Sequence, residues 1–106
     1  LENAGKAGAY MRDALEEIMS VHESIGQVRG MGLMLGVDFV KDRMTKQPDK
    51  KLRDRVEQYA FEHGLITLGC GASTIRFAPS LTISEQEIDR GLEIFHHVIS
   101  LAEQEK

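Results

Sequence analysis

Arg76 is the residue whose type and setting most clearly suggest chemistry. It lies between Ile75 and Phe77 in a segment of high strand propensity. Alternation along a strand places Ile75 and Phe77 on one face and the guanidinium on the other. An arginine held in this way can bind a carboxylate or a phosphate through two parallel hydrogen bonds. A lone surface arginine can equally pair with a nearby Asp or Glu, and the spacing leaves both interpretations open.

Other residue types that carry chemistry are isolated or wrongly spaced. The one cysteine, Cys70, can form neither an internal disulfide nor, by itself, a cysteine-based metal site. His96 and His97 are adjacent, so they diverge around a helix and are not expected to hold a metal as an i, i+4 pair would. Gly30 and Gly32 lack the third glycine and the following helix that a nucleotide-phosphate fingerprint needs. We therefore expect no metal ligand and no catalytic triad in this chain.

The composition predicts one small domain. The 106 residues are 42% hydrophobic, which suffices for one modest core, so we expect residues 1–106 to form a single domain. The formal net charge is -4, and basic residues are scattered apart from an alternation with acids on an expected helix, at Lys50, Lys51, Arg53 and Arg55. This balance argues against a nucleic-acid partner. No apolar run reaches membrane-spanning length and no signal peptide is visible, so we expect a cytoplasmic protein without a membrane partner.

Hydrophobic periodicity predicts helices that alternate with short strands. The expected order is helix 2–22, short strand 28–29, long strand 33–39, helix 48–63, strand 65–68, strand 74–77 and a helix from 84 to 102. The long strand should bury one face, made of Leu33, Leu35, Val37 and Phe39. Consecutive strands flanked by helices predict an α+β fold, with a small antiparallel or mixed sheet of three to four strands and helices packed on one face. The other face would be exposed or covered by a partner.

Local signals mark the expected ends of these elements. A polar loop is expected over 41–47, and Pro48 fits the first turn of the following helix. Gly64 is placed to be the left-handed C-cap of that helix. Ser84 and Glu87 have the spacing of a capping box at the start of the last helix.

Four stretches carry a resemblance to a known family. They are V-R-G-M-G-L-M-L-G-V at 28–37, H-G-L-I at 63–66, G-C-G-A-S-T-I-R-F-A-P-S-L-T-I at 69–83 and S-E-Q-E-I-D-R-G-L-E-I at 84–94. In this order they resemble the C-terminal small domain of class III pyridoxal-phosphate-dependent aminotransferases of the 4-aminobutyrate and ornithine type. The arginine of the I-R-F-A-P stretch binds the substrate carboxylate in that family, so the resemblance assigns this role to Arg76. One departure is Ser80 after Pro79, where many relatives have a second proline, which slightly loosens the turn.

The resemblance implies a function for a longer protein. In the family, the Schiff-base lysine, the phosphate-binding loop and the aspartate on the pyridine nitrogen lie in a large domain upstream of anything in this sequence. Residues 1–106 would then be a C-terminal fragment that holds no catalytic or cofactor-binding residue and is inactive by itself. The full-length protein would be a homodimer that binds pyridoxal phosphate and moves an amino group from an ω-amino acid, such as 4-aminobutyrate, to a 2-oxo acid.

Two further interpretations stay open. The chain can be a stand-alone α+β ligand-binding or regulatory module without catalysis, whose anion site is formed by Arg76 and the turn at 69–71. Alternatively, its main role is that of a lid and packing surface within the enzyme. The residues that would grip the far end of a substrate are not in this chain, so the amino donor is not specified.

Overall fold

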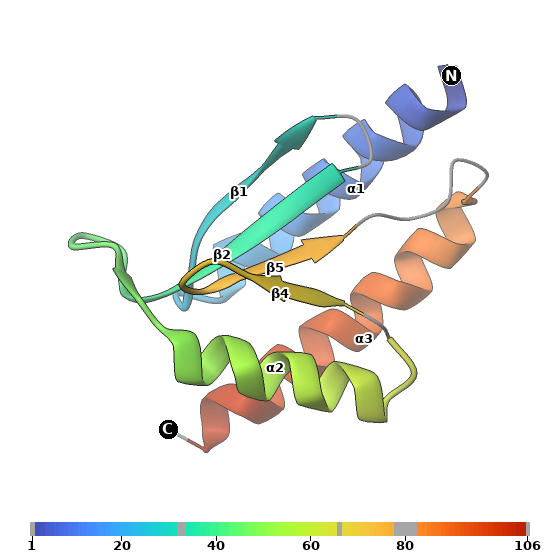
Figure 1. The fold of residues 1–106 in the computed structure, drawn as a ribbon. Helices are drawn as coiled ribbons and strands as arrows, with labels where there is room; N and C mark the ends of the chain where they lie inside the picture. Colours follow the sequence, from blue (N-terminus) through green and yellow to red (C-terminus); the bar gives the residue numbers. More distant parts are fainter. Residues whose placement is uncertain (1, 32–33, 66, 78–82, 106) are drawn as a thin grey trace.

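The computed structural model describes residues 2–31, 34–65, 67–77 and 83–105 (Figure 1). Their helices and strands run in the order α1 (Glu2–Val21), β1 (Ile25–Met31), β2 (Met34–Asp42), β3 (Gln47–Pro48), α2 (Lys50–Glu62), β4 (Leu68–Cys70), β5 (Thr74–Phe77) and α3 (Glu85–Gln104). None of these helices combines the length and the apolar character of a membrane span.

The strands form one five-stranded sheet in the order β1–β2–β5–β4, with the short β3 paired to β2. Every pairing between the described strands is antiparallel. The register aligns Val28, Val37 and Ile75 across β1, β2 and β5. The predicted α+β class is confirmed, and β3 is a strand that the sequence did not reveal.

One hydrophobic core joins the three described helices to one face of the sheet. Its largest fully buried side chains are Phe39, Phe95, Leu15, Ile25, Leu35, Leu52, Ile75 and Ile99. The ring of Phe95 on α3 lies edge-on to Phe39 and Phe77, with ring centroids 6.4 and 4.9 Å apart. Buried and exposed residues alternate along β2 and β5, so the helices cover one face and leave the other open. In Figure 1, α1 lies behind β1, β2 and β5.

The second helix starts later than predicted, and the placement of Pro48 in its first turn is wrong. Pro48 belongs to β3 and lies opposite Val40 of β2. The amide of Asp49 donates to the carbonyl of Phe39 at 3.0 Å, which extends this pairing up to the residue before the helix. Asp49 is then the N-cap, because its Oδ1 accepts a hydrogen bond from the amide of Leu52 at 3.1 Å. The expected loop is shorter as well, since β2 continues to residue 42.

The strand predicted at 65–68 lies instead at 68–70. Gly64 has the predicted left-handed conformation, with φ of 86°, and it directly follows His63, which is the C-cap of α2. The amide of Leu65 donates to the carbonyl of Ala60 at 2.8 Å, so it completes the end of α2 and does not enter the sheet. Gly69 is therefore a strand residue, and the turn of the hairpin spans 71–73.

The remaining local signals have mixed outcomes. The capping box is confirmed: the Ser84 hydroxyl accepts from the amide of Glu87, and the Glu87 carboxylate accepts from the amide of Ser84, both at 3.1 Å. The first strand is longer than predicted, and the register of its pairing with β2 shifts between Ile25 and Gln27. The expectations for Gly32, Leu33, Pro79 and Ser80 fall outside the described residues.

Candidate functional site

Arg76 lies on β5 with its side chain on the open face of the sheet. Ile75 and Phe77 are buried on the helix-covered face, whereas Arg76 is exposed, as the alternation predicted. β5 is paired on both sides, so Arg76 lies opposite Gly36 of β2 and opposite Leu68 of β4. The backbone that carries the guanidinium is therefore held by two ladders of hydrogen bonds.

The guanidinium of Arg76 makes no hydrogen bond or ion pair with any described residue. Asp38 is an acid on the same face, opposite Thr74. Its Oδ1 pairs with Nη2 of Arg29 at 3.3 Å and accepts a hydrogen bond from the hydroxyl of Thr74. Asp38 is thus engaged by other partners, and the described residues do not support a surface ion pair as the role of Arg76.

The surroundings of Arg76 suit an anion that also carries apolar groups. Arg29, Gly36 and Arg76 line one hollow on the open face. The register places Gly36 between the two arginines, and a glycine has no side chain to fill the space between them. Met34 and Leu68 on this face are 58% and 59% exposed. Exposed apolar side chains beside a cation are typical of a binding or docking surface.

Arg53 of α2 is a buried charged residue that sequence reasoning missed. Only 5% of its surface is exposed, and its Nη1 donates to the carbonyls of Cys70 and Thr74, both at 2.9 Å. A signal for its burial was present in the spacing. Position 53 shares one helix face with Val56 and Ala60, which are both buried, so Arg53 belongs to the apolar stripe rather than to a solvated face.

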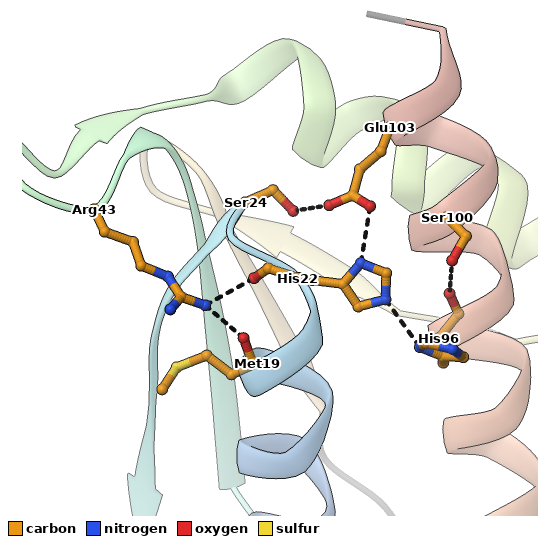
Figure 2. A network of polar contacts seen from close by, with 7 residues as sticks. All are labelled: Met19, His22, Ser24, Arg43, His96, Ser100 and Glu103. Atoms are coloured by element: carbon orange, nitrogen blue, oxygen red, sulfur yellow. Dashed lines mark hydrogen bonds and ion pairs between the residues drawn. The ribbon is translucent and has the colours of Figure 1, made fainter.

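A second polar cluster, shown in Figure 2, ties the end of α1 to α3. The buried His22 has its Nδ1 2.8 Å from Oε1 of Glu103 and its Nε2 2.9 Å from Nδ1 of His96. The hydroxyl of Ser24 donates to Oε2 of Glu103 at 2.6 Å. Arg43 donates to two backbone carbonyls where α1 ends. Because these groups are engaged with one another, the cluster holds elements together rather than presenting a group to a ligand.

The histidines of α3 diverge as predicted. His96 faces His22, whereas the ring centroid of His97 lies 5.5 Å from that of His63. Over the described part of the chain, no group of three or more His, Cys, Asp or Glu residues is arranged to hold a metal ion. Cys70 is a free thiol of intermediate burial on β4.

The fold and the site define a small α+β domain that presents an arginine from a central strand on an open sheet face. Residues 1–99 match the model of the family described as aminotransferase class-III, and the chain belongs to this family.

Relatives in sequence and in structure agree with this assignment. The leucine/methionine racemase of Thermococcus litoralis is 38% identical over 98% of this chain and 24% of its own length. The 4-aminobutyrate aminotransferase GabT of Escherichia coli is 35% identical over 98% of this chain and 25% of its own length. The crystal structure of the omega transaminase from Pseudomonas jessenii in complex with PMP matches with a TM-score of 0.90 and 31% identity, over 97% of this chain and 23% of that one. The chain therefore spans about a quarter of the length of these proteins.

Pyridoxal phosphate, which the family resemblance implies, does not fit the described residues by themselves. A lysine that forms a Schiff base is normally activated in a desolvated pocket. The described lysines are instead exposed, at Lys6, Lys41, Lys46, Lys50 and Lys51. No catalytic step is therefore assigned to these side chains.

Proposed function

We propose that this chain is the C-terminal small domain of a pyridoxal-phosphate-dependent aminotransferase in which Arg76 binds the carboxylate of the substrate. The full-length enzyme moves the amino group of an ω-amino acid, such as 4-aminobutyrate, to a 2-oxo acid. The cofactor, held by the remainder of the protein, supplies the electron sink for this chemistry. The contribution of this chain is orientation, because a carboxylate fixed by Arg76 directs the amine of the substrate toward the reacting centre.

The observation that carries the proposal is the presentation of Arg76. Its neighbours Ile75 and Phe77 are buried and hold the backbone, while the guanidinium faces the open side without a partner among the described residues. A guanidinium matches a carboxylate with two parallel donors, so this geometry suits bidentate capture. The name of the GabT relative supports an ω-amino acid as the donor.

A second function is favoured by the similarity to a leucine/methionine racemase. A racemase of α-amino acids must also fix the carboxylate while the bond to the α-hydrogen is broken and remade. The contact made by Arg76 serves either reaction, so the role proposed for this residue does not depend on which reaction the enzyme carries out.

We also propose that the face of the sheet that is open in this domain is a packing surface in the full-length protein. Met34 and Leu68 expose apolar side chains beside Arg76, which favours contact with another part of the protein. We propose that the rest of the full-length chain covers this face, so that the domain acts as a lid and packing surface over the substrate. A cytoplasmic homodimer remains the prediction for the full-length protein.

Substitution of Arg76 tests the proposed role in the full-length holoenzyme. Arg76→Ala should lower kcat/KM for an amino-acid substrate by roughly thirty-fold to several thousand-fold, because it removes a charge-assisted pair worth roughly 2–5 kcal/mol. The matched substrate is the same compound with its carboxylate converted to a carboxamide, and its kcat/KM should barely change. Cofactor content must be equal in both proteins. An equal loss with both substrates would exclude carboxylate binding by Arg76.

The two candidate reactions are separated by their products. In one experiment the full-length enzyme is supplied with 4-aminobutyrate and a 2-oxo acid, and in a second experiment with one enantiomer of an α-amino acid and no 2-oxo acid. An aminotransferase forms a new amino acid from the 2-oxo acid in the first experiment. A racemase converts the single enantiomer into a mixture of both enantiomers in the second. Chiral chromatography distinguishes the two outcomes.

A further inference from the structure

We infer that Arg53 is a positioning residue for substrate binding, which acts on Arg76 through the β4–β5 hairpin. This inference rests on the proposed function of Arg76. Arg53 itself touches no substrate, because it is buried and its hydrogen bonds run to α2 and to the hairpin.

The contacts of Arg53 lie at the base of the hairpin turn. Cys70 and Thr74 are register partners, and they are the last pair of the hairpin before the turn at 71–73. Nη1 of Arg53 donates to the carbonyl oxygens of both residues, and Nε donates to the carboxylate of Asp54 at 2.8 Å. One nitrogen therefore fixes both strands relative to α2. Thr74 precedes Arg76 by two residues, so this contact sets the start of the strand that carries the guanidinium.

A second contact between α2 and the hairpin lies one helical turn further on. The carboxylate of Glu57 accepts a hydrogen bond from the amide of Gly69 at 2.6 Å. A Cβ at position 69 would lie 3.1 Å from both carboxylate oxygens of Glu57 and 3.2 Å from Nη1 of Arg53. Glycine at this position thus allows both side chains of α2 to approach the strand.

Burial makes the position of Arg53 well defined. A guanidinium removed from water is tolerated only when its donors are satisfied, so the side chain is held by the three acceptors that it binds. Because α2 is packed into the core, these hydrogen bonds hold the hairpin in a fixed position relative to α2. A displacement of about 1 Å at a binding group can lower the rate of an enzyme by as much as about a hundred-fold.

The test uses the full-length holoenzyme and the variant Arg53→Met. This variant keeps a long apolar side chain and removes every donor to the hairpin. We expect kcat/KM for the amino-acid substrate to fall by roughly ten-fold to a hundred-fold, while the value for the matched carboxamide falls by less than about two-fold.

Arg55→Met is the matched control. Arg55 also lies on α2, and it binds the carbonyl of Ala102 at 3.2 Å and the carboxylate of Glu105 at 3.2 Å, at the end of α3. Its loss weakens a helix–helix contact without touching the hairpin. We expect equal, small effects of Arg55→Met on the two substrates.

The pathway from Arg53 to Arg76 is tested by a double variant. If Arg53 acts through Arg76, then Arg53→Met should have less than about a two-fold further effect in an Arg76→Ala background. Additive losses, or equal losses of Arg53→Met on the two substrates, would overturn the inference and leave Arg53 with a purely structural role. A failure of the proposed function is distinct, because Arg76→Ala alone would then lose activity equally with both substrates.

A milder variant covers the case in which Arg53→Met does not fold. Glu57→Ala removes only the acceptor for the amide of Gly69 and leaves the buried arginine in place. It should lower kcat/KM by at least about two-fold for the amino acid and leave the carboxamide unchanged. No selectivity in this variant would count against control of Arg76 by the α2 contacts.

Discussion

Two arginines serve one hairpin in opposite ways. Arg53 reaches the hairpin from α2, is buried, and donates to backbone carbonyls of Cys70 and Thr74. Arg76 leaves the same hairpin on the open face and has no partner among the described residues. A guanidinium whose donors are satisfied within the chain fixes backbone, whereas one whose donors face outward remains available to a ligand. The role of a charged residue here follows from its burial and its partners rather than from its type.

The two faces of β2 extend this comparison and give the largest expected effect. Val37 is fully buried between Val28 and Ile75, while Asp38 lies on the open face. Val37→Asp should unfold the domain, because an unpaired buried carboxylate costs several kcal/mol. That loss is comparable to a total stability of roughly 5–15 kcal/mol.

Asp38→Asn is the matched variant on the open face. Asparagine keeps an oxygen that can accept from the Thr74 hydroxyl, so the stability should change by less than about 1 kcal/mol. The stabilities of Val37→Asp and Asp38→Asn are compared by thermal denaturation and by the soluble yield of the full-length protein. Similar shifts in the unfolding midpoint would contradict the assignment of the two faces.

These faces were predictable because their signal is local. Alternation at Leu35, Val37 and Phe39 requires only that the segment be a strand, and burial follows the predicted period. The start of α2 was not predictable in the same way. Pro48 fits a first helical turn by itself, but pairing of Val40 with Pro48 and of Phe39 with Asp49 keeps these residues in the sheet. That pairing depends on how a separate strand is placed.

Substitution of each arginine by lysine tests whether the two residues use their guanidinium groups differently. The expected effect on kcat/KM is the next largest. Arg76→Lys keeps the charge but cannot form two parallel hydrogen bonds, so kcat/KM for the amino-acid substrate should fall by at least about thirty-fold. In Arg53, a single nitrogen makes both contacts to the hairpin. A lysine ammonium also offers several donors from one nitrogen, so Arg53→Lys should cost less than about five-fold.

Steady-state kinetics of the two lysine variants, with the amino acid and its carboxamide, measures this difference. Equal losses in the two variants would show that the fork geometry of Arg76 is not used. A larger loss for Arg53→Lys would place the dominant contribution in the support of the hairpin.

The two arginines also differ in how far the sequence could reveal them. Arg76 was found because strand alternation and the I-R-F-A-P stretch both lie within a few residues of it. Arg53 was hidden in an alternation of acids and bases, and its acceptors are 17 and 21 residues away along the chain. Its spacing with Val56 and Ala60 indicates burial, but the identity of its partners depends on the arrival of the hairpin at α2.

The smallest expected effect tests whether contacts of the helical layer are independent of the open face. The hydroxyl of Tyr10 on α1 donates to Asp89 on α3 at 2.6 Å, and this hydrogen bond raises the pKa of Tyr10 from its ordinary value of 10.0 to about 12. Because the pKa is higher in the folded state, the stabilisation is complete below pH about 10 and is lost as the pH rises through about 12. The difference in unfolding midpoint between wild type and Tyr10→Phe should therefore shrink over this range. Denaturation at a series of pH values measures it, with Tyr59→Phe as a parallel case because a hydrogen bond to Glu105 also raises the pKa of Tyr59. If the difference in unfolding midpoint stays constant up to pH 12, the hydrogen bond to Asp89 is not the source of the stabilisation.

Tyr10 also tests whether the two sides of the sheet are coupled. Because Tyr10 lies on the helix side, Tyr10→Phe should leave the preference of the enzyme for the carboxylate over the carboxamide substrate unchanged at neutral pH. A change in that preference would show that the two sides are coupled.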